Sequence, residues 1–261
     1  MRRTALSVPS YRPFLLGSCV SSLGDGMDYV AIAWLLVQLG GTSAQMGLLL
    51  AATSLPGVLL SPVIGVLVDR WDRRLTCVAM DACRAGVTGG LAALAAGSAL
   101  RPWHLYGGVL VVATCDRFHW PAAGGLVREL VPRGLLLSAN SLGGIATQAG
   151  VVVGAGLVGP VIGVLGAPAA LLLNAGSFAA SAACTGACRR GILRPAATAR
   201  PSWRADLAGG ARYLAAHRRI LLIAAVQVSL YMVLYTGNVL LPSFATGVLG
   251  AGPVGFGVID A

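Results

Sequence analysis

The chain has 261 residues, of which 56% are hydrophobic and 11% are charged, with 19 basic and 9 acidic side chains. A soluble globular protein carries about 25% charged residues. This chain has less than half of that fraction, too few charged residues to cover a surface that faces water. The composition therefore excludes a soluble globular protein. It predicts an integral membrane protein.

Long apolar stretches predict the transmembrane helices, because a helix needs about 20 apolar residues to cross the hydrocarbon core of a bilayer. The last residues, GPVGFGVIDA, resemble the opening of an eighth helix. We therefore predict an all-α membrane protein with a six-helix bundle over 1–188, a basic connector over 189–219 and the start of a second bundle over 220–261. In chain order, the predicted helices cover 13–39, 44–68, 75–97, 104–124, 138–163, 166–188 and 220–242.

The arginines in the loops predict the orientation, because cytoplasmic loops carry an excess of basic residues. With these helices, sixteen arginines fall on the side of the N-terminus and Arg101 falls on the other side. We therefore expect a multi-pass protein of the plasma membrane with a cytoplasmic N-terminus. The basic excess follows from this topology, so no nucleic acid is needed as a partner. Within the connector, WRADLAGGARYLAAHRR is interpreted as a helix on the membrane surface, with a basic loop as the alternative.

The segment GVLVDRWDRR, residues 65–74, places five charges between two apolar stretches. Its arginines suit a cytoplasmic turn between the second and third helices. They do not account for Asp69 at the end of a helix or for Gly65 one turn earlier. A carboxylate at that place can cap the N-terminus of a neighbouring helix or pair with arginines.

This segment resembles the loop 2–3 signature of the major facilitator superfamily, except that Asp72 stands where the general pattern has glycine. The segments DRFHWPAAGGLVRELVPRGLLLSAN, residues 116–140, and SWRADLAGGARYLAAHRRI, residues 202–220, are similar to the branch that contains enterobactin-type and macrolide-type exporters. The resemblance implies a major-facilitator-type six-helix N-terminal bundle followed by a seventh span. The implied function is secondary active efflux of small hydrophobic or amphiphilic compounds, by proton antiport or driven by another gradient.

The resemblance also implies a cytoplasmic latch. In the family, the aspartate of this signature holds the cytoplasmic face closed against a helix of the second half, and the glycine lets helices approach. The latch residues here would be Gly65, Asp69, Arg70, Arg73 and Arg74.

The fifth helix carries a second motif, GLVGPVIG, in which Gly159, Pro160 and Gly163 resemble the GPxxG part of the antiporter signature. The general pattern has glycine where Ala155 and Val164 stand. Small residues permit close helix contact, and proline bends a helix. The partial match favours export over import.

Charged residues inside the spans need a partner or a function, because a charge at mid-membrane is costly. Asp25 and Asp28 are three residues apart and share one face of the first helix, so we interpret them as proton-coupling or substrate-pathway residues. A purely structural role is the alternative. Asn174 and Gln148 either line the same pathway or make interhelical hydrogen bonds.

Four further charges, Asp81 and Arg84 on the third helix and Asp116 and Arg117 on the fourth, predict a cross-helix ion network. We expect this network to be structural and to transmit motion from the latch.

Several function classes find no support in the sequence. There is no lysine and hence no nucleotide-binding loop of the G-x-x-x-x-G-K type, so we expect no ATP hydrolysis. Neither the histidines nor the six cysteines have metal-ligand spacing, and no catalytic constellation is present, so we expect no cofactor, no metal and no enzymatic activity.

The expected partners are a small-molecule substrate, the lipid bilayer and protons. Because the family builds its pathway between two six-helix halves, we expect this chain to be incomplete and not to transport alone. A self-complementary dimer is an alternative that would restore a pathway. A non-transporting binding or regulatory module derived from a transporter half is the alternative function.

Overall fold

The computed structural model describes residues 4–188, 209, 212–213 and 215–247, and these residues contain helices but no strand. All seven predicted helices are present, and the all-α fold is confirmed. The predicted eighth helix and most of the basic connector lie outside the described residues. The long helices are α1 (Tyr11–Gln38), α2 (Ser43–Arg70), α3 (Arg73–Ala96), α4 (Pro102–Leu130), α5 (Leu136–Leu165), α6 (Ala167–Ala187) and α8 (Arg218–Gly247), and the short 3-10 turns are η1 (Ala5–Ser7) and η2 (Arg133–Leu135).

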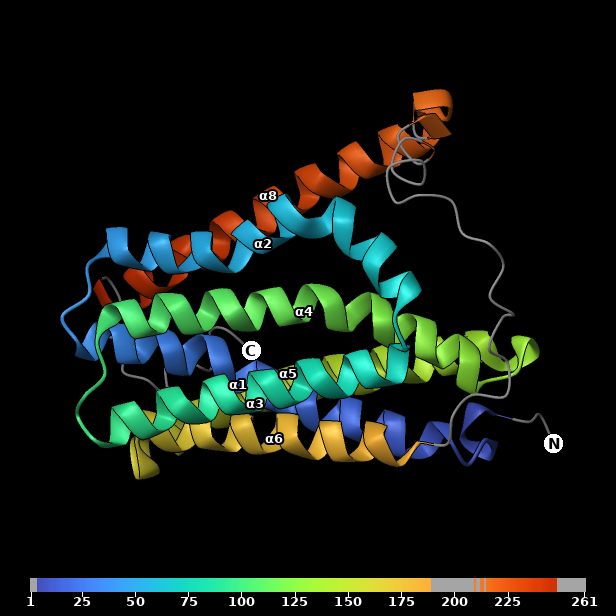
Figure 1. Ribbon diagram of the computed structural model, residues 1–261. Coiled ribbons are helices and arrows are strands. Elements are labelled where there is room, and N and C mark those ends of the chain that lie inside the picture. Colours follow the sequence, from blue (N-terminus) through green and yellow to red (C-terminus); the bar gives the residue numbers. More distant parts are fainter. Residues whose placement is uncertain (1–3, 189–208, 210–211, 214, 248–261) are drawn as a thin grey trace.

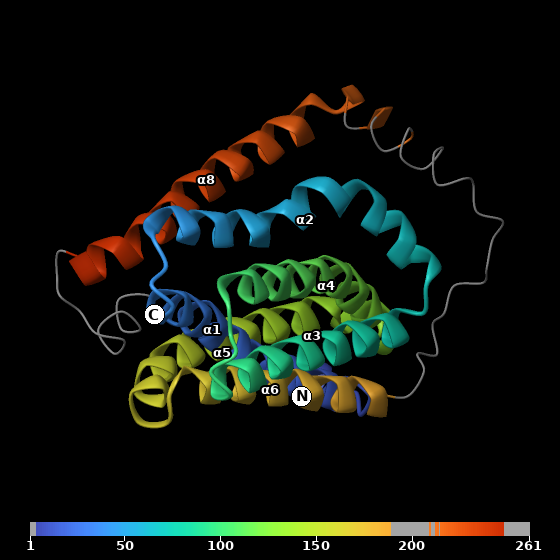
Figure 2. The same cartoon turned by 60° about the vertical axis from the view of Figure 1, so that its left-hand side comes forward.

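The first six helices form one antiparallel bundle, as Figure 1 shows. In this bundle α1 packs between α5 and α6, α3 packs against α6 and α4, and α2 packs on α4. The arrangement leaves α2 in an outer layer, next to α8 (Figures 1 and 2). Because α2 is held mainly by α4, there is space between α1 and α2 for a cavity.

Within the described residues, five helices are long and apolar enough to span a membrane: α1, the Ser43–Leu60 part of α2, α3, α5 together with η2, and α6. On this criterion α4 does not qualify, although the sequence predicts a span there. It carries Asp116 and Arg117 near its middle. Asp116 faces Arg84 of α3, so α4 depends on the bundle around it to hold this charge.

Glycines bring α1 and α5 into contact. A Cβ atom at Gly150 would lie 2.9 Å from the carbonyl oxygen of Cys19, and one at Gly154 would collide with the carbonyl oxygen of Leu23. The close contact expected of the antiporter-like motif is not found at Gly163, because no atom lies within 4 Å of a Cβ placed there. The glycines in close contact with α1, Gly150 and Gly154, therefore lie about two and a half to three and a half turns before Gly163 on α5.

Helix caps explain where two of the chain reversals occur. Thr42 starts α2 in a capping box with Gln45. The residue that departs from the family signature, Asp72, is the N-cap of α3, and its Oδ1 accepts a hydrogen bond from the Leu75 N–H at 3.0 Å. An aspartate N-cap satisfies one of the free N–H groups of a helix start, which glycine cannot do with a side chain.

One end of the bundle holds η1, the α2–α3 turn, the α4–α5 connection and the end of α6 (Figure 1). We call it the arginine-rich end, since six arginines lie there. Arg101, the residue before α4, is at the opposite end. The arginines of the first group are Arg12, Arg70, Arg73, Arg74, Arg128 and Arg133.

Candidate functional site

Two cavities open inside the bundle, one on each side of the middle of α1. The larger, of about 390 Å³, is lined by α1, α4 and α5 and by Arg84 of α3, and extends from Tyr11 near the arginine-rich end to Asp25. The smaller, of about 180 Å³, lies between α1, α2 and α4 and contains Asp28. We call them the Asp25 cavity and the Asp28 cavity.

The Asp25 cavity combines one carboxylate with aromatic and small residues. Gln148 lines it together with Asp25, so the structure brings these two predicted pathway residues to the same space. Asp25 makes no hydrogen bond or ion pair with any described residue. The aromatic lining residues are Tyr11, Phe14 and Trp120, and the polar ones beside Asp25 include Ser18, Ser21, Ser22, Asn140 and Thr147.

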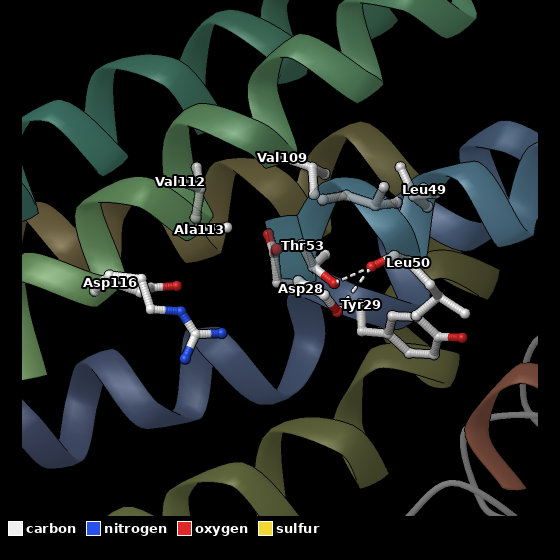
Figure 3. Close-up of a pocket in the computed structure, with 12 residues that line it drawn as sticks. Asp28, Tyr29, Leu49, Leu50, Thr53, Val109, Val112, Ala113 and Asp116 are labelled. Atoms are coloured by element: carbon white, nitrogen blue, oxygen red, sulfur yellow. Dashed lines mark hydrogen bonds between the residues drawn. The ribbon is translucent and has the colours of Figure 1, made fainter. Parts of the chain in front are cut away.

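The Asp28 cavity is smaller, and its carboxylate has a partner. Figure 3 shows Asp28 of α1, Thr53 of α2 and Asp116 of α4 around it. Asn174 of α6 donates a hydrogen bond from Nδ2 to Asp28 Oδ1 at 2.7 Å. The Ser177 hydroxyl lies 3.2 Å from Asn174 Oδ1 and donates to it.

Asn174 is fully buried and lines neither cavity. Of the two roles that the sequence leaves open for this residue, the structure places it in the interhelical hydrogen bond. Any effect of Asn174 on a pathway would therefore act through Asp28.

A buried charge cluster separates the two cavities. Arg84 of α3 pairs with Asp81 one turn earlier, and its Nη1 lies 2.6 Å from Asp116 Oδ1 on α4. Asp81 and Arg84 are 0% and 2% exposed. Since Arg84 borders the Asp25 cavity and Asp116 borders the Asp28 cavity, the Arg84–Asp116 pair forms part of the wall between them.

The cluster contains two residues that the sequence reading does not include. His119 places Nε2 3.3 Å from Asp81 Oδ1, and the Arg84 guanidinium lies over the Phe178 ring at 4.3 Å. His119 lies one turn after Asp116 on α4, and this spacing is the sequence signal that could have placed it in the cluster. Arg117, the fourth predicted member, contacts α2 instead, where a Cβ at Gly57 would lie 3.0 Å from its Cζ.

Residues of the signature segment join four helices at the arginine-rich end. Arg73 reaches Glu129 Oε1 of α4 at 3.0 Å and Asp69 Oδ1 of α2 at 3.4 Å. Arg74 donates a hydrogen bond to the carbonyl oxygen of Gly186 on α6. The side chain of Asp69 is 72% exposed.

Gly65 is exposed, and no described atom lies within 4 Å of a Cβ placed there, so it makes no close helix contact in this structure. Of the predicted second half, α8 is the described helix, and it packs against α2, the helix that ends at Arg70. Trp71, between Arg70 and Asp72, stacks on Phe118 with the ring centroids 5.7 Å apart.

Among the described residues, no three histidine, cysteine, aspartate or glutamate side chains are grouped so as to hold a metal ion. The site offers two carboxylates inside a membrane bundle, one cavity large enough for a small molecule, and a charge cluster between the cavities.

Comparisons with known proteins agree with this fold. The family model described as transmembrane secretion effector matches residues 4–261. The chain is 30% identical over 169 residues to the uncharacterized MFS-type transporter YfiS of Bacillus subtilis. This alignment covers 64% of this chain and 39% of YfiS. It is 31% identical over 83 residues to the multidrug efflux pump Tap of Mycobacterium tuberculosis, an alignment that covers 32% of this chain and 20% of Tap.

These alignments thus span less than half the length of either relative. The family model, in contrast, covers almost all of this chain. The helical bundle, the charged turn between α2 and α3 and this match lead to one conclusion: the chain belongs to the transmembrane secretion effector family of the major facilitator superfamily.

Proposed function

We propose that the protein belongs to a secondary transporter that exports small hydrophobic or amphiphilic compounds by proton antiport, within the branch of enterobactin-type and macrolide-type exporters. The observation that carries the proposal is the pair of cavities at mid-bundle, with Asp25 in one and Asp28 in the other. A carboxylate at this depth can exchange a proton, and a cavity beside it can hold a substrate. The name of the relative Tap supports efflux of drugs.

In this proposal the N-terminus and the arginine-rich end face the cytoplasm of a plasma-membrane protein. Six arginines at one end of the described bundle and Arg101 at the other support this orientation. The Asp25 cavity, which reaches Tyr11, then extends toward the cytoplasmic side. Arg73, bonded to Asp69 and Glu129, would carry motion of the latch segment into α4, the helix that lines both cavities.

The test measures uptake and release of a fluorescent dye by proteoliposomes with an imposed proton gradient. One arm contains the 261-residue chain, and a second contains it co-produced with the C-terminal half of YfiS. If the pathway needs two bundles, only the second arm moves the dye. In the active arm, replacing Asp25 and Asp28 by asparagine should abolish the pH dependence of efflux.

A non-transporting membrane module is the second candidate, and the same assay separates it. Such a module would bind the dye and leave the gradient-dependent flux at the level of protein-free liposomes in both arms, which would contradict transport. An unchanged pH dependence in the double Asp→Asn variant would contradict proton coupling through these two residues. Saturable flux in the single-chain arm would contradict the need for a second bundle.

A further inference from the structure

We propose that Cys83 of α3 and Cys115 of α4 form a modification site, at which a lipid-soluble quinone oxidises the two thiols to a disulfide that links the helices. The inference goes beyond the proposed function, because the reaction needs neither a transported substrate nor a proton gradient. Three observations carry it: the register of α3 and α4, the contact between the two thiols, and the difference in their exposure.

The register of α3 and α4 brings the two cysteines to the same level of the bundle. The helices are antiparallel neighbours, and Arg84 of α3 lies 2.6 Å from Asp116 of α4. The same pairing continues further along both helices, since a Cβ at Gly108 would lie 2.6 Å from Leu91. Each cysteine stands one residue before a member of the Arg84–Asp116 pair, about 1.5 Å away along the helix axis. The two cysteines therefore lie opposite each other.

The two thiols also touch. The side chains of Cys83 and Cys115 share a hydrogen bond that joins α3 to α4. Disulfides join Cα atoms about 4.4–6.8 Å apart, and two side chains this short meet only where their Cα atoms are close to that range. A disulfide between these cysteines therefore needs little movement of the two helices.

The two thiols differ in their exposure. Cys83 is exposed near the middle of the 24-residue helix α3, whereas Cys115 is 5% exposed. Helix α3 lies on the side of the bundle away from α8 (Figures 1 and 2). At this depth the exposed surface of a membrane bundle faces lipid chains. An apolar molecule dissolved in the bilayer thus reaches Cys83 first, and the shielded Cys115 is within reach of Cys83.

The reaction that fits this place is a two-electron oxidation. The two thiols give two electrons and two protons to one quinone, which leaves as the hydroquinone, and one sulfur–sulfur bond replaces the two S–H bonds. A quinone is uncharged and soluble in lipid, and the transfer leaves no charge in the membrane interior, where a charge is costly. Glutathione keeps cytosolic thiols reduced, but this charged peptide does not enter the hydrocarbon core. The disulfide would therefore persist and fix α3 to α4 beside the Arg84–Asp116 pair.

A second cysteine pair provides the control. Cys77 of α3 and Cys188 after α6 belong to one cluster of the core and are 0% and 2% exposed. Because neither thiol is open to lipid, a quinone in the bilayer should leave both reduced.

The test treats the 261-residue chain in lipid nanodiscs with decylubiquinone, whose ring carbons are all substituted, so that it cannot add to a thiol. After denaturation, a maleimide counts the remaining thiols, and mass spectrometry identifies the disulfide-linked peptides. We expect the count to fall from six to four and the linked peptides to contain Cys83 and Cys115. Ferricyanide, an oxidant confined to water, should leave all six thiols reduced.

Three variants assign the site. Cys83→Ser and Cys115→Ser should each abolish the cross-link and keep five thiols after the quinone treatment. The matched control is Cys77→Ser, which removes another cysteine of α3 and should leave the cross-link as in the wild type. Phenylarsine oxide measures the proximity of the thiols without an oxidant, because its arsenic binds two neighbouring sulfur atoms and releases one water. We expect one arsenic per wild-type chain, lost in Cys83→Ser.

Each contrary result overturns a defined part of the inference. A wild-type chain that binds no arsenic would overturn the contact between the thiols. Arsenic binding without oxidation by the quinone would overturn the redox step, and equal oxidation by ferricyanide would overturn access from lipid. These outcomes on the wild-type chain hold whether or not the variants fold. A failure of transport would leave them unaffected, so this proposal and the proposed function can fail separately.

Discussion

Asp28 and Asp25 lie one helical turn apart on α1, and the bundle surrounds them differently. Asp28 accepts a hydrogen bond from a fully buried asparagine and lines a cavity of about 180 Å³. Asp25 bonds to no described residue and lines a cavity of about 390 Å³. A carboxylate that already has a partner stabilises the fold, whereas an unpaired one keeps its interaction for a ligand or a proton. We infer that binding takes place where the fold leaves polar contacts incomplete.

The arginine nearest each cavity gives the largest expected contrast. Arg84→Ala, beside the Asp25 cavity, should lower the free energy of unfolding by about 3–5 kcal/mol, because it leaves Asp81 and Asp116 buried without a cation. Arg117→Ala, beside the Asp28 cavity, should cost less than about 1 kcal/mol, because Arg117 is exposed. Thermal unfolding of both variants in the same detergent measures the difference. Equal losses would mean that the cluster between the cavities is not what holds α3 to α4.

The glycine contact between α1 and α5, which both line the Asp25 cavity, gives the next effect. Gly154→Ala should destabilise the bundle by about 1–3 kcal/mol, because the added Cβ would collide with the carbonyl oxygen of Leu23. The control on the same helix is Gly163→Ala, which meets no atom within 4 Å and should be neutral or stabilising by up to about 1 kcal/mol. Denaturant unfolding of both variants checks the sign. A stable Gly154→Ala variant would contradict the close contact.

A double-mutant cycle tests whether Asp28 and Asp25 differ in their attachment to the fold. Asn174→Ala and Asp28→Ala should be coupled by about 0.5–3 kcal/mol, because the two side chains share a hydrogen bond of 2.7 Å. Asn174→Ala and Asp25→Ala should add within about 0.5 kcal/mol. The stabilities of the five variants and the wild type provide both values. Equal coupling free energies of Asn174 with Asp28 and with Asp25 would contradict the distinction between the two aspartates.

The sequence predicts the fold well, because apolar stretches long enough to cross a bilayer alternate with short polar turns. The helix ends are also visible in it: Thr42 and Gln45 form a capping box, and Asp72 caps α3. The exception is α4, whose charges make it a poor span by composition. Its place depends on α3, which supplies the partner for Asp116.

The site is harder to predict because its contacts depend on the orientation of each helix about its own axis. Asp116 and Arg117 are neighbours in the sequence, yet one faces Arg84 and the other faces α2, since successive helical residues point about 100° apart. The histidine of the cluster has no sequence signal that names Asp81 as its partner. Likewise, a spacing of three residues puts Asp25 and Asp28 on one face, but only the position of α6 determines that Asp28 alone meets Asn174.

The smallest expected effect concerns Asp25 itself. Asp25→Asn should leave the free energy of unfolding within about 0.5 kcal/mol of the wild type, because Asp25 makes no hydrogen bond or ion pair with a described residue that the change would remove. Asp28→Asn should instead lower it by about 1 kcal/mol or more, since the hydrogen bond from Asn174 loses its charged acceptor. Chemical unfolding of both variants in one lipid–detergent mixture at neutral pH gives the comparison. A loss of 1 kcal/mol or more from Asp25→Asn would show that this carboxylate is a structural residue.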